Sequence, residues 1–248
     1  MIWQDCNGSQ HIGPLDGVLF RLVESQEQIA TLSYVDTLEE QTLLEQLLED
    51  VKPAYPEHRD DLHYLLKTPF RYPPLQWGSR FGQTHQPSIF YGGSSIETTL
   101  AESAYYRFLF WFSMDSVSIK NKIRSEHTLF SARYYTNKGI RLQSAPFDEY
   151  LTELADPSHY QACQAIGTAM RAAGVEAFEY RSARDPAGGT CTGLFTPDVF
   201  THPKPLDMSQ WLGEVSADKV AFKRLDSKEI ISFDLDIFEV DGRLPLPA

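Results

Sequence analysis

The sequence predicts an α+β fold that forms a single domain. Helical and strand-like segments are interleaved, but most strand-like runs follow one another without a long crossover, which is typical of α+β rather than doubly wound proteins. The chain contains no Gly-x-Gly-x-x-Gly and no Gly-Lys-Ser/Thr pattern, so the two commonest nucleotide-binding folds are excluded. Because 248 residues suffice for one large core, we expect residues 1–248 to form one domain.

The N-terminal part predicts a strand followed by a pair of helices. Residues 17–23 are β-prone and carry Arg21. Thr37-x-x-Glu40 is a capping box, and Leu44, Leu47, Leu48 and Val51 follow it at helical spacing. A second amphipathic segment, residues 57–66, should end before Pro69. We expect residues 35–68 to form a helical hairpin that is inserted in the domain and packs on its main body.

The middle of the chain predicts a strand, a sharp turn and a long helix. Residues 87–91 are strand-like, and Gly92-Gly93 predicts a turn out of that strand. Ser94-x-x-Glu97 should cap a helix that runs to about Phe110. The buried stripe predicted for this helix is Ile96, Leu100, Ala104 and Phe108.

The rest of the chain predicts further strands around one more helix. Residues 110–142 alternate apolar and polar residues in several places and predict strands. Pro157-Ser158 precede a helix that ends near Gly174. The apolar side predicted for it is Ala162, Ala165, Ile166, Ala169 and Met170. Strands are also predicted at residues 175–180 and 190–195, and one or two more within residues 219–239.

The charge balance excludes some classes of partner. The chain has 22 basic and 34 acidic residues and a net charge of −12. A general nucleic-acid or anionic-membrane surface rests on clustered Lys and Arg, so we expect neither. The net negative charge does not exclude a local anion-binding pocket, because a few arginines are enough to form one.

The spacing of the cysteines and the length of the apolar runs indicate the cellular compartment of the protein. Cys6, Cys163 and Cys191 are widely spaced and show no CxxC or Cys/His metal pattern, so we expect no disulfide framework and no metal. Residues 1–13 do not resemble a signal peptide, and no run approaches the roughly 20 apolar residues of a membrane helix. We therefore expect a cytoplasmic protein.

Two polar clusters indicate a site for an anionic dinucleotide. Arg80, Tyr91 and Glu102 follow one another at intervals of eleven residues, and residues 180–185 (YRSARD) form the second cluster around Ser182. At 100° per residue, Glu102 lies about 200° from the buried stripe of its helix and should face solvent or a cleft. Together the clusters offer a cation for phosphate, an aromatic face for a base and a carboxylate for a developing sugar cation.

Each of these residues also has an ordinary structural interpretation. A glutamate on a helix is usually solvated, an arginine in an acidic protein often forms a surface ion pair, and a strand tyrosine usually packs. Ser182 is typical of a turn cap, and a nucleophilic role is disfavoured because no histidine and no Gly-x-Ser-x-Gly elbow lie nearby. We interpret Arg181 and Arg184 as partners of Glu179 and Asp185 in local ion pairs. Among the histidines, His85 is the one that we expect to border the site.

At these residues the chain resembles the RES-domain family, the toxin half of a bacterial toxin–antitoxin pair. Arg80 in Gly78-Ser79-Arg80-Phe81-Gly82 is similar to the family's glycine-arginine-phenylalanine motif. The other matches in order are Arg21 after Phe20, Tyr91, Glu102, the segment 154–160 with the helix after it, and Ser182. The resemblance covers nearly the whole chain. It departs from the family in the helices inserted between Arg21 and Arg80 and in the glycines after Tyr91.

The resemblance implies a fold and a set of site residues. The fold would be similar to that of mono-ADP-ribosyltransferase toxins, with a split, strongly bent β-sheet core and flanking helices. NAD would be the substrate. Glu102 would stabilise the ribosyl cation, and Arg80 and Arg21 would hold the pyrophosphate. Tyr91 would stack on the nicotinamide, and Ser182 would orient a ribose or nicotinamide group.

The resemblance also implies a function with open alternatives. The chain would be an NAD-consuming toxin that cleaves the nicotinamide–ribose bond by hydrolysis or phosphorolysis, held inactive by a cognate Xre-like antitoxin and part of a homo-oligomer within that complex. One alternative is a protein mono-ADP-ribosyltransferase, because donor-site residues are shared and acceptor specificity lies in loops. Another is a catalytically silent module that binds a nucleotide or the antitoxin.

Overall fold

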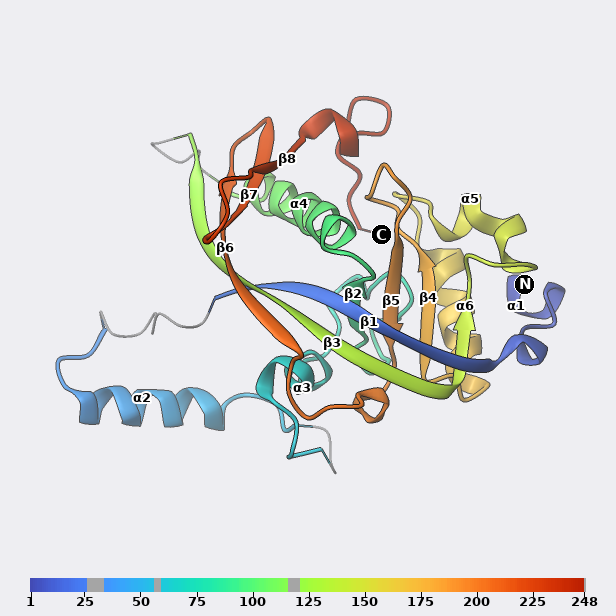
Figure 1. Ribbon diagram of the computed structural model, residues 1–248, viewed down its shortest axis with the longest axis horizontal. Coiled ribbons are helices and arrows are strands. Elements are labelled where there is room, and N and C mark those ends of the chain that lie inside the picture. The colour runs from blue at the N-terminus through green and yellow to red at the C-terminus, as the bar shows by residue number, and fades with distance from the viewer. Residues whose placement is uncertain (26–33, 56–58, 116–120, 248) are drawn as a thin grey trace.

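One long, bent strand organises the fold. The structure is a computed structural model that describes residues 1–25, 34–55, 59–115 and 121–247. Strand β3 (Ile123–Arg141) pairs along its first half with β6 (Asp207–Val215) and along most of its length with β1 (Gly13–Glu24), both antiparallel. Its last residues pair in parallel with β4 (Ala177–Arg181). Figure 1 shows β1 and β3 crossing the molecule together as its spine.

The strands of the described residues form one mixed sheet of eight, in the order β1-β2-β5-β4-β3-β6-β7-β8. A further pairing of β1 with β3 closes the first five strands of this order into a ring. The remaining bounds are Phe90–Gly93 for β2, Thr190–Leu194 for β5, Lys219–Arg224 for β7 and Ile231–Asp234 for β8. The α+β prediction is confirmed. The expectation of a split sheet is wrong, because β3 runs through both halves and joins their hydrogen bonding.

Strand β3 and strand β6 correct the sequence prediction for the centre of the chain. Where residues 110–142 are described, they hold one strand rather than several: helix α4 continues to Phe112, and β3 is a single strand of 19 residues. Strand β6 was not predicted. The strands expected near residues 17–23, 175–180 and 190–195 are confirmed, as are two strands within residues 219–239.

Helix α4 (Ile96–Phe112) lies across the sheet near β1 and β7 (Figure 1). Its N-cap is Ser95, whose hydroxyl accepts a hydrogen bond from the N–H of Thr98, so the prediction of Ser94 as cap is wrong by one residue. Leu100, Ala104 and Phe108 are buried as predicted, and Ile96 is partly buried. They pack in one core with Leu129, Trp211, Val215 and Phe222 of the sheet.

Gly92 and Gly93 belong to strand β2 and pair with β5, so the turn predicted at these glycines is wrong. Glycine is required at position 92 because the backbone of the neighbouring strand β1 passes very close to it. A Cβ on Gly92 would lie 2.7 Å from the carbonyl oxygen of Phe20 in β1. The chain turns instead at Ser94 and Ser95, directly before α4.

Helix α6 (Gln161–Ala172) covers β4 and β5 at the other end of the molecule, beside α1 (Ile2–Asp5) and α5 (Leu151–Leu154) (Figure 1). Ile166 and Met170 are buried as predicted and Ala162 and Ala169 are partly buried, whereas Ala165 is exposed. These helices enclose a second core with Phe81, Phe147 and Phe178.

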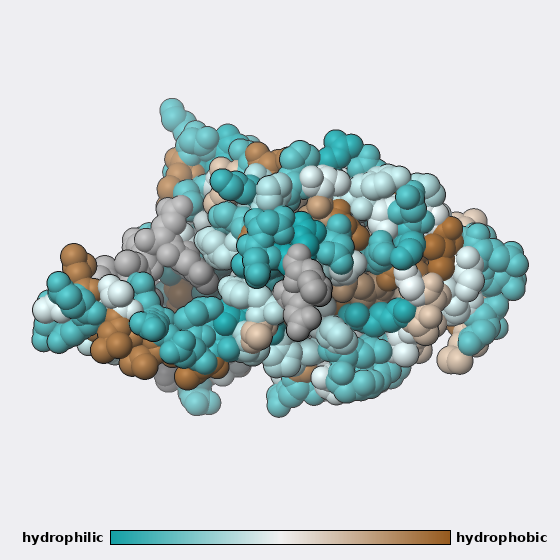
Figure 2. All heavy atoms as spheres, turned by 90° about the horizontal axis from the view of Figure 1, so that it is seen from below, coloured by the Kyte–Doolittle hydropathy of each residue, from teal (hydrophilic) through white to brown (hydrophobic). Residues whose placement is uncertain are grey.

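The inserted helices do not form a hairpin on the main body. Helix α2 (Leu38–Asp50) begins at Thr37 as predicted, since the Thr37 hydroxyl accepts from the N–H of Glu40, but it extends away from the sheet (Figure 1). Its apolar side chains are exposed, with Leu43 at 56% and Leu47 at 54%. Figure 2 shows hydrophobic surface at this end of the molecule. Periodicity predicted the helix correctly, but it does not determine what covers the apolar face.

Helix α3 (Tyr64–Arg71) begins later than the predicted segment 57–66, of which residues 57 and 58 lie outside the described residues. Pro69 lies inside α3 and does not end it. Burial of Leu65 and Leu66 against the core offsets the hydrogen bond that proline removes. In the described part of the chain, no helix is both long and apolar enough to cross a membrane.

Candidate active site

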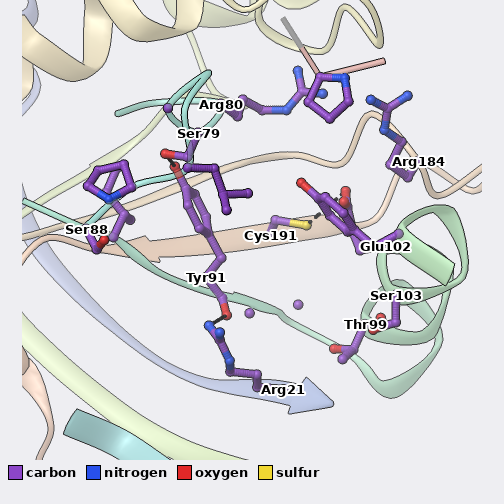
Figure 3. Close-up of a pocket in the computed structure, with 18 of the residues that line it drawn as sticks. Arg21, Ser79, Arg80, Ser88, Tyr91, Thr99, Glu102, Ser103, Arg184 and Cys191 are labelled. Carbon is purple, nitrogen blue, oxygen red and sulfur yellow. Dashed lines mark hydrogen bonds between the residues drawn. The ribbon is translucent and has the colours of Figure 1, made fainter. Parts of the chain in front are cut away.

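A pocket of about 390 Å³ lies between β1, β2, α4 and the loops that follow β4 and precede β2. Arg21, Arg80, Tyr91 and Glu102 all line it, although they come from four separate elements. Figure 3 shows these side chains around the cavity. Ser182 lies directly behind Glu102 and bonds to it. The structure therefore brings together all five residues that the sequence predicted for one site.

Glu102 and Ser182 form the most direct contact in the site. Ser182 Oγ donates a hydrogen bond of 2.5 Å to Glu102 Oε1. The same hydroxyl accepts from the backbone N–H groups of Arg184, at 3.1 Å, and Asp185, at 2.9 Å. Ser182 is thus a turn cap and a partner of the carboxylate at once, and its side chain is 4% exposed. The cap fixes the hydroxyl, and the hydroxyl holds one oxygen of the half-buried Glu102 in place.

Cys191 of β5 is the second neighbour of that carboxylate. Its Sγ donates to Glu102 Oε1 at 3.6 Å. Burial, and the negative charge of Glu102, raise the pKa of the Cys191 thiol well above its ordinary value. The pKa of Tyr180 is raised too, by burial and then by Cys191 and Glu102. Both groups are therefore neutral at physiological pH, and Glu102 supplies the one carboxylate that lines the pocket in the described part of the chain.

Tyr91 anchors the loop that carries Arg80. Its hydroxyl shares a hydrogen bond of 3.0 Å with Ser79 Oγ and accepts from the N–H of Phe81 at 3.1 Å. Burial raises the pKa of Tyr91, so the hydroxyl keeps its proton. Its ring meets that of Tyr180 edge-on, with centroids 6.3 Å apart. Tyr91 is therefore fixed at the hydroxyl end while its ring lines the pocket.

Glycines let the Arg80 loop pack tightly. Gly78 has φ of +76°, and a Cβ there would lie 2.4 Å from the carbonyl oxygen of Gly82, so only glycine fits without strain. On the other side, Gly167 of α6 lies under the loop, and a Cβ on it would clash with the carbonyl oxygen of Phe81. Because of these close contacts, the loop packs tightly between Tyr91 and α6, and this packing fixes the orientation of the Arg80 side chain.

Arg80 is 9% exposed and has no carboxylate within ion-pair distance among the described residues. Its Nη1 donates to the carbonyl oxygen of Asp156 at 2.8 Å, and its Cζ lies 4.5 Å from the ring centroid of Tyr160. Burial opposes its charge, but Tyr160, Cys163 and Glu102 raise its pKa by charge interaction and hold it above the ordinary value. Arg80 is therefore a fixed, permanently charged group in the pocket.

Arg21 lies at the other end of Tyr91, as Figure 3 shows. Its Nη1 donates to the backbone carbonyl of Tyr91 at 2.8 Å, and its Cζ lies 4.8 Å from the ring centroid of Phe90. Burial lowers the pKa of Arg21 to about 10, so the side chain is still protonated at neutral pH. Arg21 and Arg80 therefore offer two separate positive charges, one at each end of the tyrosine.

Arg184 lines the pocket and does not form the ion pair with Asp185 that the sequence suggested. It is 4% exposed, and its Nη2 donates to the carbonyl oxygen of Pro157 at 2.6 Å. Asp185 instead accepts from the hydroxyl of Thr98 at 2.8 Å. Glu179 pairs with Arg141, at 3.4 Å, rather than with Arg181. Neighbours in sequence pointed to the wrong partners, because turns direct adjacent side chains to different sides.

The structure also corrects the outer limits of the site. His85 is exposed and does not line the pocket, so the expectation that it borders the site is wrong. Tyr180, from the second predicted cluster, lines the pocket, whereas sequence reasoning missed three further lining residues: Tyr106, Tyr160 and Cys191. Tyr106 lies four residues after Glu102 on the same helix, a spacing that would have placed it beside the carboxylate. The others come from elements whose proximity no local pattern reports.

The fold and the pocket together define an α+β protein whose described residues place one carboxylate and three arginines around a concave site. The chain belongs to the RES domain family, whose model matches residues 55–215. Arg80, Tyr91, Glu102 and Ser182 lie within the matched region, whereas Arg21 and helix α2 precede it.

Three chains among the solved structures match this chain, and the likeness described here is distant in sequence. The chain is similar to one described as the crystal structure of the M. tuberculosis MbcT-MbcA toxin-antitoxin complex, with 11% identity and a TM-score of 0.48. That alignment covers 94% of this chain and 91% of the other. None of the curated proteins matches the chain.

Proposed function

We propose that this protein is an NAD-consuming toxin of a toxin–antitoxin system and that it cleaves the bond between nicotinamide and ribose. The observation that carries the proposal is the Glu102–Ser182 contact inside an arginine-lined pocket. Membership of the RES domain family supports it, because the sequence resemblance to that family implies the same chemistry.

The chemistry needs a carboxylate close to the ribose. Departure of neutral nicotinamide leaves positive charge on the anomeric carbon and ring oxygen, and a fixed carboxylate stabilises that charge. In the proposed role, Glu102 supplies this charge, and Ser182 holds Oε1 so that Oε2 can face the sugar. A preorganised carboxylate costs no rearrangement when the bond breaks, and this is the advantage of holding it from behind.

The pyrophosphate of NAD needs positive charge, which the pocket supplies at both ends of Tyr91. A guanidinium binds phosphate oxygens through two parallel N–H donors. In the proposed complex, Arg80 binds one phosphate and the tyrosine ring packs on the nicotinamide. The pocket is of the size class that small-molecule sites have.

A toxin of this kind requires an inhibitor in the cell that makes it. We propose a cognate antitoxin protein as the partner, with this chain as a homo-oligomer in the complex. Expression of the chain alone should then arrest a bacterial host and deplete its NAD, and co-expression of the antitoxin should restore growth. Normal growth and normal NAD with verified soluble expression would favour a silent binding module instead.

Incubation of the purified protein with NAD, with products resolved by chromatography and mass spectrometry, tests the chemistry. Free ADP-ribose would indicate hydrolysis, and ADP-ribose 1″-phosphate, formed with phosphate present, would indicate phosphorolysis. A mass increase on a protein would identify a mono-ADP-ribosyltransferase. No loss of NAD under any of these conditions would contradict the proposal.

A further inference from the structure

Arg184 is a buried arginine whose guanidinium group is only partly hydrogen-bonded. Its Nη2 donates to the carbonyl oxygen of Pro157 at 2.6 Å and to the hydroxyl of Tyr160 at 3.3 Å. Its Cζ lies 3.5 Å from the ring centroid of Tyr105. Yet Nη1 is shielded from water and has no hydrogen-bond partner among the described residues. No carboxylate of the described chain lies within 4.0 Å of its guanidinium nitrogens.

A buried charge without a counter-ion is costly, because neither water nor an opposite charge replaces its lost hydration. The nearest acidic residue in sequence, Asp185, does not help. Its Oδ2 accepts from Thr98 Oγ1 and from the N–H of Gly189, and its Oδ1 accepts from the N–H of Ala187. The described residues therefore supply no counter-ion to Arg184, and an anionic ligand in the pocket would supply one.

Arg80 lies at the same corner of the pocket. Its Nη1 donates to the carbonyl oxygen of Asp156, and Arg184 donates to that of the next residue, Pro157. Both arginines also contact Tyr160, Arg80 over the ring and Arg184 at the hydroxyl. Figure 3 shows the two guanidinium groups on the same side of the pocket, at the top of the view. Shared anchors thus hold two cations next to each other.

The pocket as a whole has a surplus of positive charge. Among the described residues, three arginines line it against one carboxylate, that of Glu102, in a protein whose net charge is −12. Two guanidinium groups fixed by carbonyl bonds suit a tetrahedral anion, because each presents parallel donors to two of its oxygens.

We propose that Arg80 and Arg184 form a two-arginine subsite for one phosphate group. The inference deepens the proposed function, on which it rests for the identity of the ligand. The phosphate comes either from the dinucleotide or from free inorganic phosphate. In both cases Arg184 binds the anion directly and Tyr160 positions both arginines.

Calorimetric titration of the wild-type protein with ADP-ribose, with inorganic phosphate and with nicotinamide riboside separates the two sources. ADP-ribose carries the pyrophosphate, phosphate is the free anion, and nicotinamide riboside has no phosphate group. Arg184→Gln should weaken binding of ADP-ribose, of inorganic phosphate, or of both, by about tenfold or more, because it removes a charge-assisted contact. Binding of nicotinamide riboside should change little.

Arg171→Gln is the matched control. Arg171 also donates to a carbonyl oxygen, that of Pro87 at 2.6 Å, and lies over an aromatic ring, with Cζ 4.2 Å from the Phe195 centroid. It does not line the pocket. Its loss should therefore cost comparable packing and leave anion affinity unchanged. Where Arg184→Gln fails to fold, Arg184→Lys tests the same point, since it keeps the charge and loses the planar fork.

Folded Arg184→Gln and Arg184→Lys variants that bind ADP-ribose and phosphate with wild-type affinity would overturn the subsite. Failure of the proposed function gives a different result. If the wild type does not consume NAD but binds ADP-ribose in an Arg184-dependent way, the subsite stands and the toxin chemistry falls. If NAD is consumed while both anions bind independently of Arg184, the chemistry stands and the subsite falls.

Discussion

Ser182 and Glu102 are 80 residues apart in sequence, and a hydrogen bond of 2.5 Å joins their side chains. The serine comes from the turn after β4 and the glutamate from the middle of α4. The turn is itself built around the serine hydroxyl, which accepts two backbone N–H groups. The orientation of the carboxylate therefore depends on the geometry of a turn that lies directly behind it and comes from a distant part of the sequence.

Ser182→Ala should lower both stability and turnover. The variant removes the acceptor of the Arg184 and Asp185 N–H groups and one of the two donors to Glu102 Oε1, so we expect a loss of about 1–3 kcal/mol of unfolding free energy. In the proposed function, kcat should fall more than KM changes, because Ser182 positions Glu102. Chemical denaturation and steady-state kinetics measure the two effects.

Ser216→Ala is the control for that experiment. The Ser216 hydroxyl also caps a turn, since it accepts from the N–H of Lys219 at 3.1 Å, but it lies outside the pocket. It should cost some stability and leave kcat unchanged. A Ser182→Ala enzyme with wild-type kcat would exclude the positioning role.

Local signals predicted those parts of the fold that depend on neighbours in sequence. The Thr37 cap of α2 and the buried stripe of α4 were correct, because capping and helical periodicity act within a few residues. Gly92 was placed in a turn, yet it lies in β2 because β1 passes close by. The exposed face of α2 and the unbroken course of β3 likewise depend on contacts between distant segments.

In the candidate site, too, local sequence signals identified some residues, whereas contacts between distant segments could not be predicted. Residue type and spacing selected Arg80, Tyr91 and Glu102, and the family resemblance added Arg21 and Ser182. All five meet around one pocket. The environment of Arg184 could not be predicted, because its neighbours Pro157, Tyr160 and Tyr105 come from other elements. Sequence proximity to Asp185 suggested an ion pair that the turn geometry prevents.

Arg80→Lys should weaken substrate binding although it keeps the charge. Lysine has no planar fork and cannot reproduce both the bond to the Asp156 carbonyl and a bidentate phosphate contact. We expect NAD affinity to fall by more than about tenfold, roughly 1.4 kcal/mol, in calorimetry on an inactive Glu102→Gln background. Arg133→Lys, at an exposed ion pair with Asp16, should have no effect on affinity. Unchanged affinity in Arg80→Lys would contradict a phosphate contact.

His127 should make stability depend on pH. Burial, and then the charge of Arg107, lower the pKa of His127 to about 4, while Glu24 acts in the opposite direction. The ring lies in β3, contacts Phe222 edge-on, and its Nε2 accepts from Arg107 Nη2 at 2.9 Å. Between pH 6.5 and about 4 the unfolded chain therefore binds a proton here that the folded protein does not.

Because the unfolded state binds more protons in that window, stability rises with pH across it and is lost on acidification. The contribution of His127 should be about 3 kcal/mol between pH 7 and pH 4. Denaturation curves of wild type and His127→Gln across this range isolate it, since other groups titrate in both proteins. Parallel stability profiles for the two would show that His127 does not titrate as its surroundings require.

Antitoxin binding should compete with occupation of the pocket. A carboxylate of the partner could pair with Arg80 or Arg21 in place of a phosphate. Two ligands that exclude each other must weaken each other's affinity equally, so a saturating non-hydrolysable NAD analogue should lower the affinity for the antitoxin. Equal affinity with and without analogue, far above the dissociation constant of the analogue, would exclude inhibition by occlusion of the pocket.

The central claim is that Glu102 performs chemistry on NAD, and the rate of NAD loss in purified wild type and Glu102→Gln measures it most directly. Glutamine keeps the oxygen that accepts from Ser182 and removes only the charge, so the melting temperature should barely change. Glu97→Gln, an exposed position on the same helix, is the control and should keep full activity. We predict that Glu102→Gln lowers the rate by at least about a hundredfold. A folded Glu102→Gln protein that consumes NAD at most of the wild-type rate would contradict the account.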